Sequence, residues 1–158
     1  MKIKKSIDLI YLIALGATIG GVLTLGIVMT STIFHSENYI GEVLSHFQEG
    51  KIMAQGFATF NYFLGFMALF ITLYEAYSYK ILQRDKTVML STLLVLGSIG
   101  LFIGVYSPKI IALQESGELI MQTQEFQNLH IASEIDFKIL VVGLLILMGR
   151  RLYVLLNR

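Results

Sequence analysis

The chain contains no cysteine and no tryptophan, and it has a single proline, Pro108, among its 158 residues. Without cysteine it cannot form a disulfide framework, a thiolate metal site or the covalent attachment of a c-type haem. Charged side chains are also scarce, at 15%, whereas 55% of the residues are hydrophobic. A soluble domain of this length needs more charge to cover its surface, so the composition indicates a membrane protein.

Long apolar stretches account for most of the chain. Three of them, Leu9–Phe34, Ile52–Tyr74 and Thr87–Pro108, hold no charged side chain, and a weaker fourth stretch follows. About 20 apolar residues cross the hydrocarbon core of a bilayer as a helix. We therefore predict an all-α integral membrane protein, a four-helix bundle that forms one domain over residues 1–158. The predicted spans are 7–34, 52–79, 87–108 and 131–156.

The basic residues gather on one side of this predicted arrangement. Segments 1–8, 75–86 and 150–158 hold nine basic and three acidic residues, whereas the other two connections hold three basic and eight acidic ones. Connections rich in lysine and arginine remain in the cytoplasm, so we predict cytoplasmic termini and two acidic outer loops. The first apolar run is too long for a cleaved signal peptide, and the lack of an arginine-rich and serine-rich leader favours a bacterial inner membrane.

Short segments outside the spans show helical patterns. Spacings of three and four residues predict two helices that lie on the outer interface. The first holds Ile40, Val43, Leu44 and Phe47 and would end at Gly50, and the second holds Leu119, Ile120, Phe126 and Leu129. Pro108 is expected to kink or end the third span, because proline lacks an N–H group.

Small residues indicate where helices approach each other. Gly16 and Gly20 in the first span, and Gly100 and Gly104 in the third, form stripes that allow close backbone contact in lipid. We expect these stripes to pack inside the bundle, and a dimer face is the alternative.

Polar residues within the spans are few. Asn61, in the middle of the second span, is expected to bridge helices by hydrogen bonds. The first three spans have no charge at their centres, which argues against an ion pump. Charges of the fourth span are expected at its ends, with Asp136 in the outer end and Arg150 and Arg151 extending to the cytoplasmic headgroups.

Histidines and carboxylates of the outer segments are the candidate metal ligands. They are His35, His46, His130, Glu42, Glu49 and Glu134. Imidazole and carboxylate groups bind zinc, iron, manganese and copper, and nearby methionine thioethers suit Cu(I). Two of the pairs are spaced four residues apart and so share a helix face. No spacing matches a dedicated metal motif, so the favoured alternative is an acidic, solvated surface with ordinary interfacial histidines.

Other functional signatures are weak or missing. A haem held by two histidines would use His35 and His130, which are predicted at similar depth but at the rim of the bundle. No nucleophile triad, phosphate loop or nucleotide fingerprint is present, so we expect no enzymatic activity. The basic residues flank the spans instead of forming a patch, so we expect no nucleic-acid partner.

Three segments of the chain resemble the four-span family DUF4149, which is similar to the eukaryotic transmembrane protein 205 group. They are Ser31–Phe34; Glu49–Met53 with Phe57, Phe60, Asn61 and Tyr62; and Tyr106–Ile110 with Phe126, Leu129, His130 and Ser133. The resemblance covers nearly the whole chain, and it departs from the family where Phe137 replaces an asparagine and where a proline near the end of the first span is missing. More distantly, the chain is similar to copper-resistance proteins and to small haem-linked membrane proteins.

The resemblance implies the four-span topology more than a function. It also implies His130 and Ser133 as the family's site, with Lys109 and Glu49 near them at the outer rim. Three functions follow as hypotheses. The first is a non-enzymatic component of the lipid bilayer that supports a membrane-protein partner or a homo-oligomer. The second is a copper-binding or copper-transport accessory that uses His130 with His35 or His46, and the third is a haem-binding redox protein.

Overall fold

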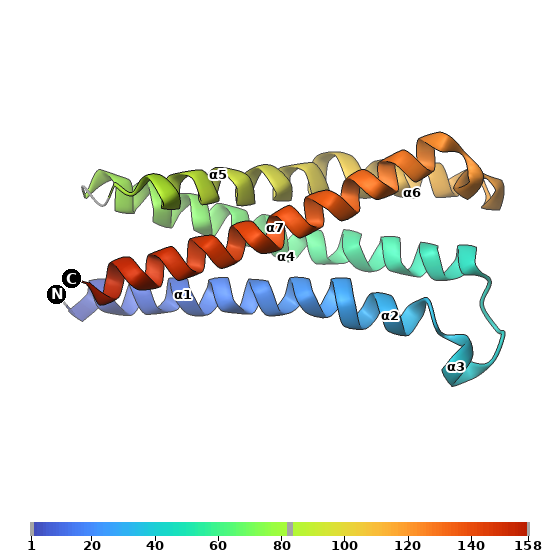
Figure 1. Ribbon diagram of the computed structural model, residues 1–158, viewed down its shortest axis with the longest axis horizontal. Coiled ribbons are helices and arrows are strands. Elements are labelled where there is room, and N and C mark those ends of the chain that lie inside the picture. The colour runs from blue at the N-terminus through green and yellow to red at the C-terminus, as the bar shows by residue number, and fades with distance from the viewer. Residues whose placement is uncertain (1, 82–83, 158) are drawn as a thin grey trace.

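The computed structural model describes residues 2–81 and 84–157, and nearly all of them are helical. Four long helical rods lie side by side, and both termini lie at the same end of the bundle (Figure 1). We call this end, which holds Lys2 and Asn157, the termini end. The opposite end is the loop end, and it holds the short helices α3 (Glu37–Ile40) and η3 (Glu118–Gln122). The described residues contain no strand, so the predicted all-α class is confirmed.

Two of the rods are single helices, and each of the other two contains a π-helical turn. In chain order the rods are α1 (Lys2–Leu23) with η1 (Thr24–Met29) and α2 (Thr30–Ile33); α4 (His46–Lys80); α5 (Lys86–Leu101) with η2 (Phe102–Tyr106) and α6 (Ser107–Glu115); and α7 (Gln124–Leu156). Each rod includes a helix long and apolar enough to cross a membrane. The chain is therefore a multi-pass membrane protein.

Side-chain caps determine where α4 and α7 begin. The Ser45 hydroxyl accepts a hydrogen bond from the backbone N–H of Gln48, and the Gln48 side chain accepts one from the N–H of Ser45. This reciprocal capping box starts α4. The Thr123 hydroxyl accepts from the N–H of Phe126 and starts α7. Both helices thus begin six or seven residues before the predicted spans, which started at 52 and 131.

The two short helices at the loop end do not cover the residues that the sequence pattern indicated. Gly41 has a φ of 72°, so the chain turns there, and α4 continues through Gly50 instead of starting after it. The predicted helix over residues 40–47 is therefore wrong. The second predicted surface helix is divided between η3 and α7, and Phe126 is buried instead of lying on a surface.

Pro108 does not end the third rod. It lies in the first turn of α6, directly after the π-helical turn η2, and the helix continues to Glu115. Proline is tolerated in the first turn of a helix, because its missing N–H group has no partner within that helix. The two π turns, η1 and η2, lie within the loop-end halves of their rods.

The apolar surface of the bundle fits a lipid environment. The interior is packed with side chains that are fully buried, among them Leu15, Val22, Ile71, Val95 and Leu144. Large apolar side chains are even more abundant outside, where Phe66 is 66% exposed and Leu93 is 62% exposed. An exposed apolar surface of this extent must be kept away from water, and the hydrocarbon core of a bilayer provides the apolar environment that does so.

The glycines that allow close helix contact are not those of the predicted stripes. A Cβ added to Gly20, Gly100 or Gly104 would have no neighbour within 4 Å, so only Gly16, beside Met148, packs as expected. The close contact lies instead at Gly143 of α7, where a Cβ would come within 3.1 Å of Val95 in α5. The predicted internal packing of the stripes is therefore wrong for three of four residues, and the dimer face stays a prediction.

A buried ion pair joins three rods at the termini end. Arg151 of α7 is 1% exposed, and its Nε and Nη2 donate hydrogen bonds to the Glu75 carboxylate of α4. The Tyr11 hydroxyl of α1 donates to the same carboxylate at 2.7 Å. The Tyr11 ring stacks on Tyr74 with the centroids 3.6 Å apart, and the Tyr74 hydroxyl donates to Asp8. Arg151 therefore does not reach the headgroups, because a carboxylate inside the bundle holds it.

Arg150, one residue earlier, behaves differently. Its guanidinium donates two hydrogen bonds to Oδ2 of Asp85, at 3.0 and 2.8 Å, and its side chain is 39% exposed. These bonds hold the pKa of Asp85 below its ordinary value. Asp85 also caps α5 by accepting from the N–H of Val88. Arg150 thus ties the end of α7 to the start of α5.

Candidate ligand cavity at the loop end

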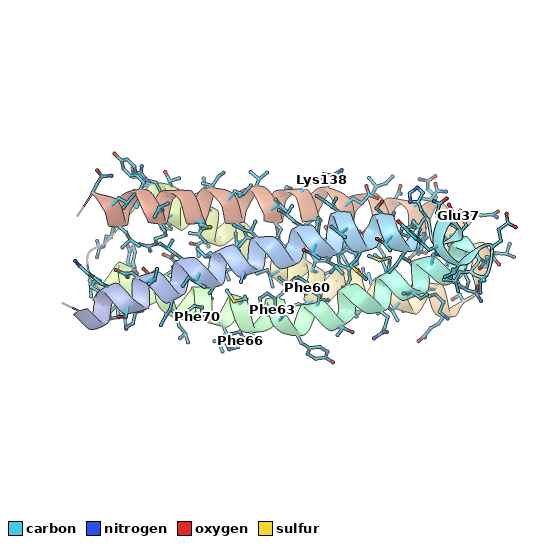
Figure 2. The ribbon with its side chains drawn as sticks, turned by 90° about the horizontal axis from the view of Figure 1, so that it is seen from below. Glu37, Phe60, Phe63, Phe66, Phe70 and Lys138 are labelled. Carbon is cyan, nitrogen blue, oxygen red and sulfur yellow. The ribbon has the colours of Figure 1, made fainter. Side chains whose placement is uncertain are left out.

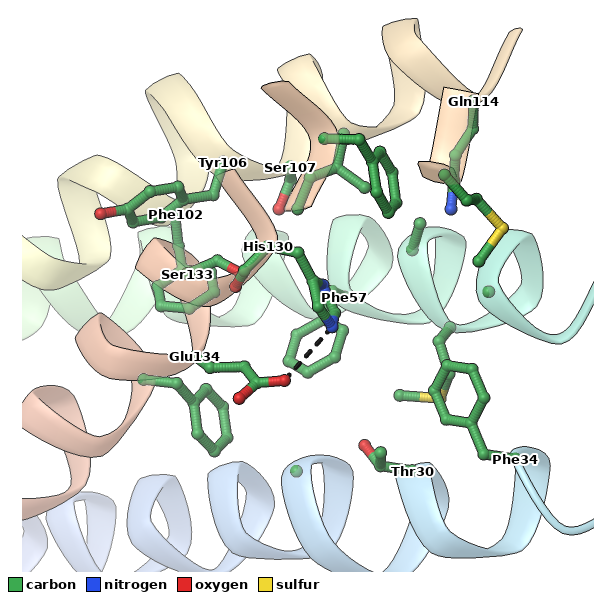
Figure 3. Close-up of a pocket in the computed structure, with 18 of the residues that line it drawn as sticks. Thr30, Phe34, Phe57, Phe102, Tyr106, Ser107, Gln114, His130, Ser133 and Glu134 are labelled. Atoms are coloured by element: carbon green, nitrogen blue, oxygen red, sulfur yellow. Dashed lines mark hydrogen bonds and ion pairs between the residues drawn. The ribbon is translucent and has the colours of Figure 1, made fainter. Parts of the chain in front are cut away.

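A cavity of about 680 Å³ opens among the rods at the loop end. Residues of η1, α2, α4, η2, α6, η3 and α7 line it, and Figure 3 shows the lining side chains between α7 and α2, in front of α4. Its size falls within the range of pockets that hold small molecules, roughly 300–1,000 Å³. The path of α7 explains the opening, because α7 runs from α6 at the loop end to α1 at the termini end and leaves α2 uncovered (Figure 1).

Aromatic side chains dominate the walls of this cavity. They are Phe34, Phe57, Phe102, Tyr106, Phe126 and Phe137. Phe137 meets Phe57 edge-to-face with the centroids 5.8 Å apart and Phe102 with the centroids 6.0 Å apart. Such edge-to-face contacts are a favourable arrangement of aromatic rings and stabilise the orientation of these three side chains.

Both π-helical turns of the described chain border the cavity. Gly26 of η1 lies on one side, and Phe102 and Tyr106 of η2 lie on another. At the end of η1, the backbone N–H of Thr30 donates to the carbonyl of Leu25, five residues back, as π geometry requires, and the Thr30 hydroxyl donates to the same carbonyl at 3.0 Å. Single π turns inside α-helices frequently occur at functional sites. Their position on two walls of one cavity supports this cavity as the functional site.

Gly26 and Phe137 close the cavity toward the middle of the bundle. A Cβ on Gly26 would lie 2.3 Å from the Phe137 ring, so the ring occupies the space that a larger residue would need. This is the position at which the family resemblance expects an asparagine. In this chain an aromatic ring fills it and keeps the inner end of the cavity apolar.

One buried polar side chain that lines the cavity has no hydrogen-bond partner among the described residues. Gln114 is 4% exposed and points into the cavity from the last turn of α6 (Figure 3). Its amide makes no hydrogen bond with any residue in the ranges 2–81 and 84–157. Its amide atoms are not enclosed by protein but reach the space of the cavity, where they can donate and accept hydrogen bonds. The unpaired amide therefore points to a ligand that completes it.

The structure arranges the predicted metal ligands as two separate pairs. His46 lies 3.3 Å from Glu49, whose other oxygen accepts from the Ser36 hydroxyl at 2.6 Å. His130 lies 3.2 Å from Glu134. His46, His130 and Glu134 line the cavity, whereas Glu49 lies behind His46.

The other two predicted ligands stand apart from these pairs. His35 bonds to the carbonyl of Ser31, and Glu42 lies exposed in the turn after Gly41. Glu42 does not share a helix face with His46, because residues 41–45 are not helical. Among the described residues, no three His, Cys, Asp or Glu side chains are grouped closely enough to hold a metal ion.

The remaining predicted site residues have structural contacts. Ser133 lines the cavity, and its hydroxyl donates to the carbonyl of His130 at 2.7 Å. Asn61 donates to the Ser107 hydroxyl at 2.7 Å and so joins α4 to α6, as expected for a helix-bridging amide. Lys109 does not line the cavity but borders a separate surface hollow with Glu125.

Two relevant residues were missed or misplaced from the sequence. The residue type of Gln114 does not mark it as a site residue in the sequence. Its helical spacing from Ser107 and Ile110 could have done so, because all three line the cavity. Asp136 was expected near the outer end of its span, but the early start of α7 places it 12 residues into a 33-residue helix. It is buried there, with one oxygen accepting from Ser98 at 2.8 Å.

The family described as a domain of unknown function, DUF4149, matches residues 13–118. The chain belongs to the DUF4149 family. The match includes the cavity walls from Gly26 to Gln114 and ends before His130 and Ser133, so the expectation of a family site at those two residues stays untested. The description of the family names no activity, and the match does not test the predicted similarity to transmembrane protein 205. No curated protein and no solved structure matches the chain.

Proposed function

We propose that this DUF4149 protein is a non-enzymatic membrane component that binds an amphiphilic small molecule in the loop-end cavity. The observation that carries the proposal is the Gln114 side chain, which is 4% exposed, has no hydrogen-bond partner and points into a largely apolar cavity. Ligand pockets are mostly apolar and contain a few polar groups that orient the ligand. The four rods then act as a scaffold that holds these walls in place.

The distribution of polar groups supports an orientation for the ligand. Gln114, His46 and His130 lie toward the loop end, whereas Phe57, Phe102 and Phe137 cluster toward the middle of the bundle. An amphiphile would place its polar head among the first group and its apolar part among the second. Ligand entry would occur between α2 and α7, on the side that faces lipid.

The charge distribution supports a cellular orientation for this site. The basic residues concentrate at the termini end, which includes Lys4, Lys5, Lys80 and Arg84. Under the positive-inside rule that end faces the cytoplasm, and the cavity then opens in the outer leaflet of a bacterial inner membrane.

Transition-metal binding is the second candidate, because two histidine–carboxylate pairs border one cavity. A copper or zinc ion would need ligands from both pairs in one coordination sphere. The haem alternative would also use His46 and His130, since His35 lies outside the cavity.

The test is to purify the protein in lipid nanodiscs and to identify retained molecules by native mass spectrometry. We expect about one amphiphile per chain, lost in Gln114→Leu and retained in Gln55→Leu, which changes an exposed glutamine of α4. Equal retention in wild type and Gln114→Leu would contradict the proposal. A Soret band or stoichiometric metal that depends on His46 and His130 would replace it with the haem or metal alternative.

A further inference from the structure

We propose that the head of this ligand is an uncharged, flat ring with oxygen atoms at its edge, carried on an apolar tail, as in the isoprenoid quinones of membranes. This inference rests on the proposed function and names the chemical class of the ligand. It concerns binding alone and requires no reaction in the cavity.

The first argument is the presence of two phenylalanine–histidine pairs on opposite walls. Phe34, directly after α2, lies beside His46 of α4 with the ring centroids 5.1 Å apart and the ring planes tilted by 51°. Phe126 and His130 of α7 stack with the centroids 6.1 Å apart and the planes 9° from parallel. All four rings line the cavity, and Figure 3 shows Phe34 and His130 on its two sides. Flat surfaces on two walls favour a flat ring between them.

The second argument is the hydrogen-bonding capacity of the polar groups at this level. Gln114 offers an amide that can donate and accept. Glu134 binds one nitrogen of His130, and Glu49 binds one nitrogen of His46, at 3.2 and 3.3 Å. The second nitrogen of each ring accepts a hydrogen bond when the imidazole is neutral and donates one when it is charged. These groups therefore suit an oxygen that is either a carbonyl or a hydroxyl, which is the difference between a quinone and a quinol.

The third argument is the charge of the cavity, which does not suit a phosphate head. Phosphate recognition normally uses arginine forks or several cations. No arginine lines the cavity among the described residues, and the single lysine, Lys138, lies on the exposed flank of α7 (Figure 2). The Glu134 carboxylate, which also lines the cavity, would repel a phosphate. The rim is thus polar with little net charge, as an uncharged head requires.

The fourth argument is the apolar end of the cavity. Below the level of the histidines the lining changes to Met53, Phe57, Phe102 and Phe137, and Phe137 against Gly26 closes it. An apolar tail that starts at the ring would contact these residues and continue into lipid between α2 and α7. The cavity therefore holds a ring head and the first part of a tail.

The experiment titrates the purified, delipidated full-length protein with decylubiquinone and, separately, with decanol, which has the same chain length without the ring. Bound molecules per chain are counted by native mass spectrometry. We expect decylubiquinone to bind at least about tenfold more tightly than decanol. Gln114→Leu removes one hydrogen bond and is expected to weaken decylubiquinone binding about tenfold. Phe126→Leu removes one stacking face and is expected to weaken it about two- to tenfold.

The outcomes separate the two proposals. Gln55→Leu is the matched control and should bind both compounds as the wild type does. If decanol binds as tightly as decylubiquinone, and if Gln114→Leu weakens the binding of both compounds to the same extent, the ring head is refuted while amphiphile binding stands. If neither compound binds and nanodiscs retain no amphiphile, both proposals fail. Gel filtration verifies that each variant is folded. If Gln114→Leu does not fold, Phe126→Leu still tests the ring head.

Discussion

The buried pair of Arg151 and Glu75 gives the sharpest prediction about stability. Arg151 is 1% exposed and the Glu75 side chain is 11% exposed, so both charges lie away from water. Removing one partner leaves the other charge buried and unpaired, which costs about 3–5 kcal/mol. We expect Arg151→Met and Glu75→Gln each to lower the free energy of unfolding by an amount in that range.

The double variant separates the pair from its surroundings. Arg151→Met with Glu75→Gln removes both charges of this pair, and the Tyr11 hydroxyl still has an amide oxygen as acceptor. We therefore expect the double variant to be more stable than either single variant. A double-mutant cycle then gives a coupling energy of about 2 kcal/mol or more. The measurement is SDS-induced unfolding of the protein in mixed micelles, followed by circular dichroism.

Arg150→Gln is the matched control for this cycle. Arg150 is the neighbouring arginine, but its side chain is 39% exposed and its partner is Asp85. Exposed ion pairs contribute little to stability. We expect a much smaller loss than at Arg151. If the Arg151 and Glu75 variants lose no more stability than Arg150→Gln, or if their effects are simply additive, the buried pair does not hold the three rods together.

Three further predictions follow from the fold and the cavity. Gly26→Ala should push the Phe137 ring into the cavity and weaken ligand retention at least about fivefold, whereas Gly20→Ala, with no neighbour, should change nothing in the same native mass spectrometry experiment. The bonds from Arg150 lower the pKa of Asp85, so this pair should stabilise the protein at neutral pH and lose its effect as pH falls through that lowered value, below 3.8. Thermal unfolding of the wild type and Asp85→Asn should differ at pH 7 and converge toward pH 3. The chain has no cysteine, so Glu42→Cys should react in whole cells with an impermeant maleimide and Arg84→Cys should not, and the reverse pattern would overturn the topology.

Hydropathy predicts the number of spans well because a bilayer imposes one strong requirement, a run of about 20 apolar residues. It places the ends less well, because caps determine them. Ser45 and Thr123 start α4 and α7 through hydrogen bonds to backbone N–H groups, and polar residues after a cap extend a helix beyond the apolar run. Because α7 begins earlier than predicted, Asp136 lies well inside the helix instead of near its end, and its side chain is buried.

The site was only partly predictable for a related reason. His46, His130 and Glu134 were identified by residue type, and they do border the cavity. Their partners were not identifiable, because pairing depends on which segments are helical and on how the rods cross. Gln114 carries no signal by type at all, since glutamine is common in polar loops. Its importance comes from burial without a hydrogen-bond partner, which only the tertiary structure reveals.

The buried Arg151–Glu75 pair at the termini end and the cavity at the loop end both follow from the way α7 packs across the bundle. Near the termini end, small residues allow close contact, with Gly16 beside Met148 and Gly143 against Val95. Further along, the space between η1 and α7 is filled by the Phe137 ring against Gly26. Beyond that ring α7 follows α6 instead of α2, and the cavity begins. The Arg151–Glu75 pair fixes the end of α7 at which packing is tight, so the opposite end can stay open for a ligand while the bundle remains stable.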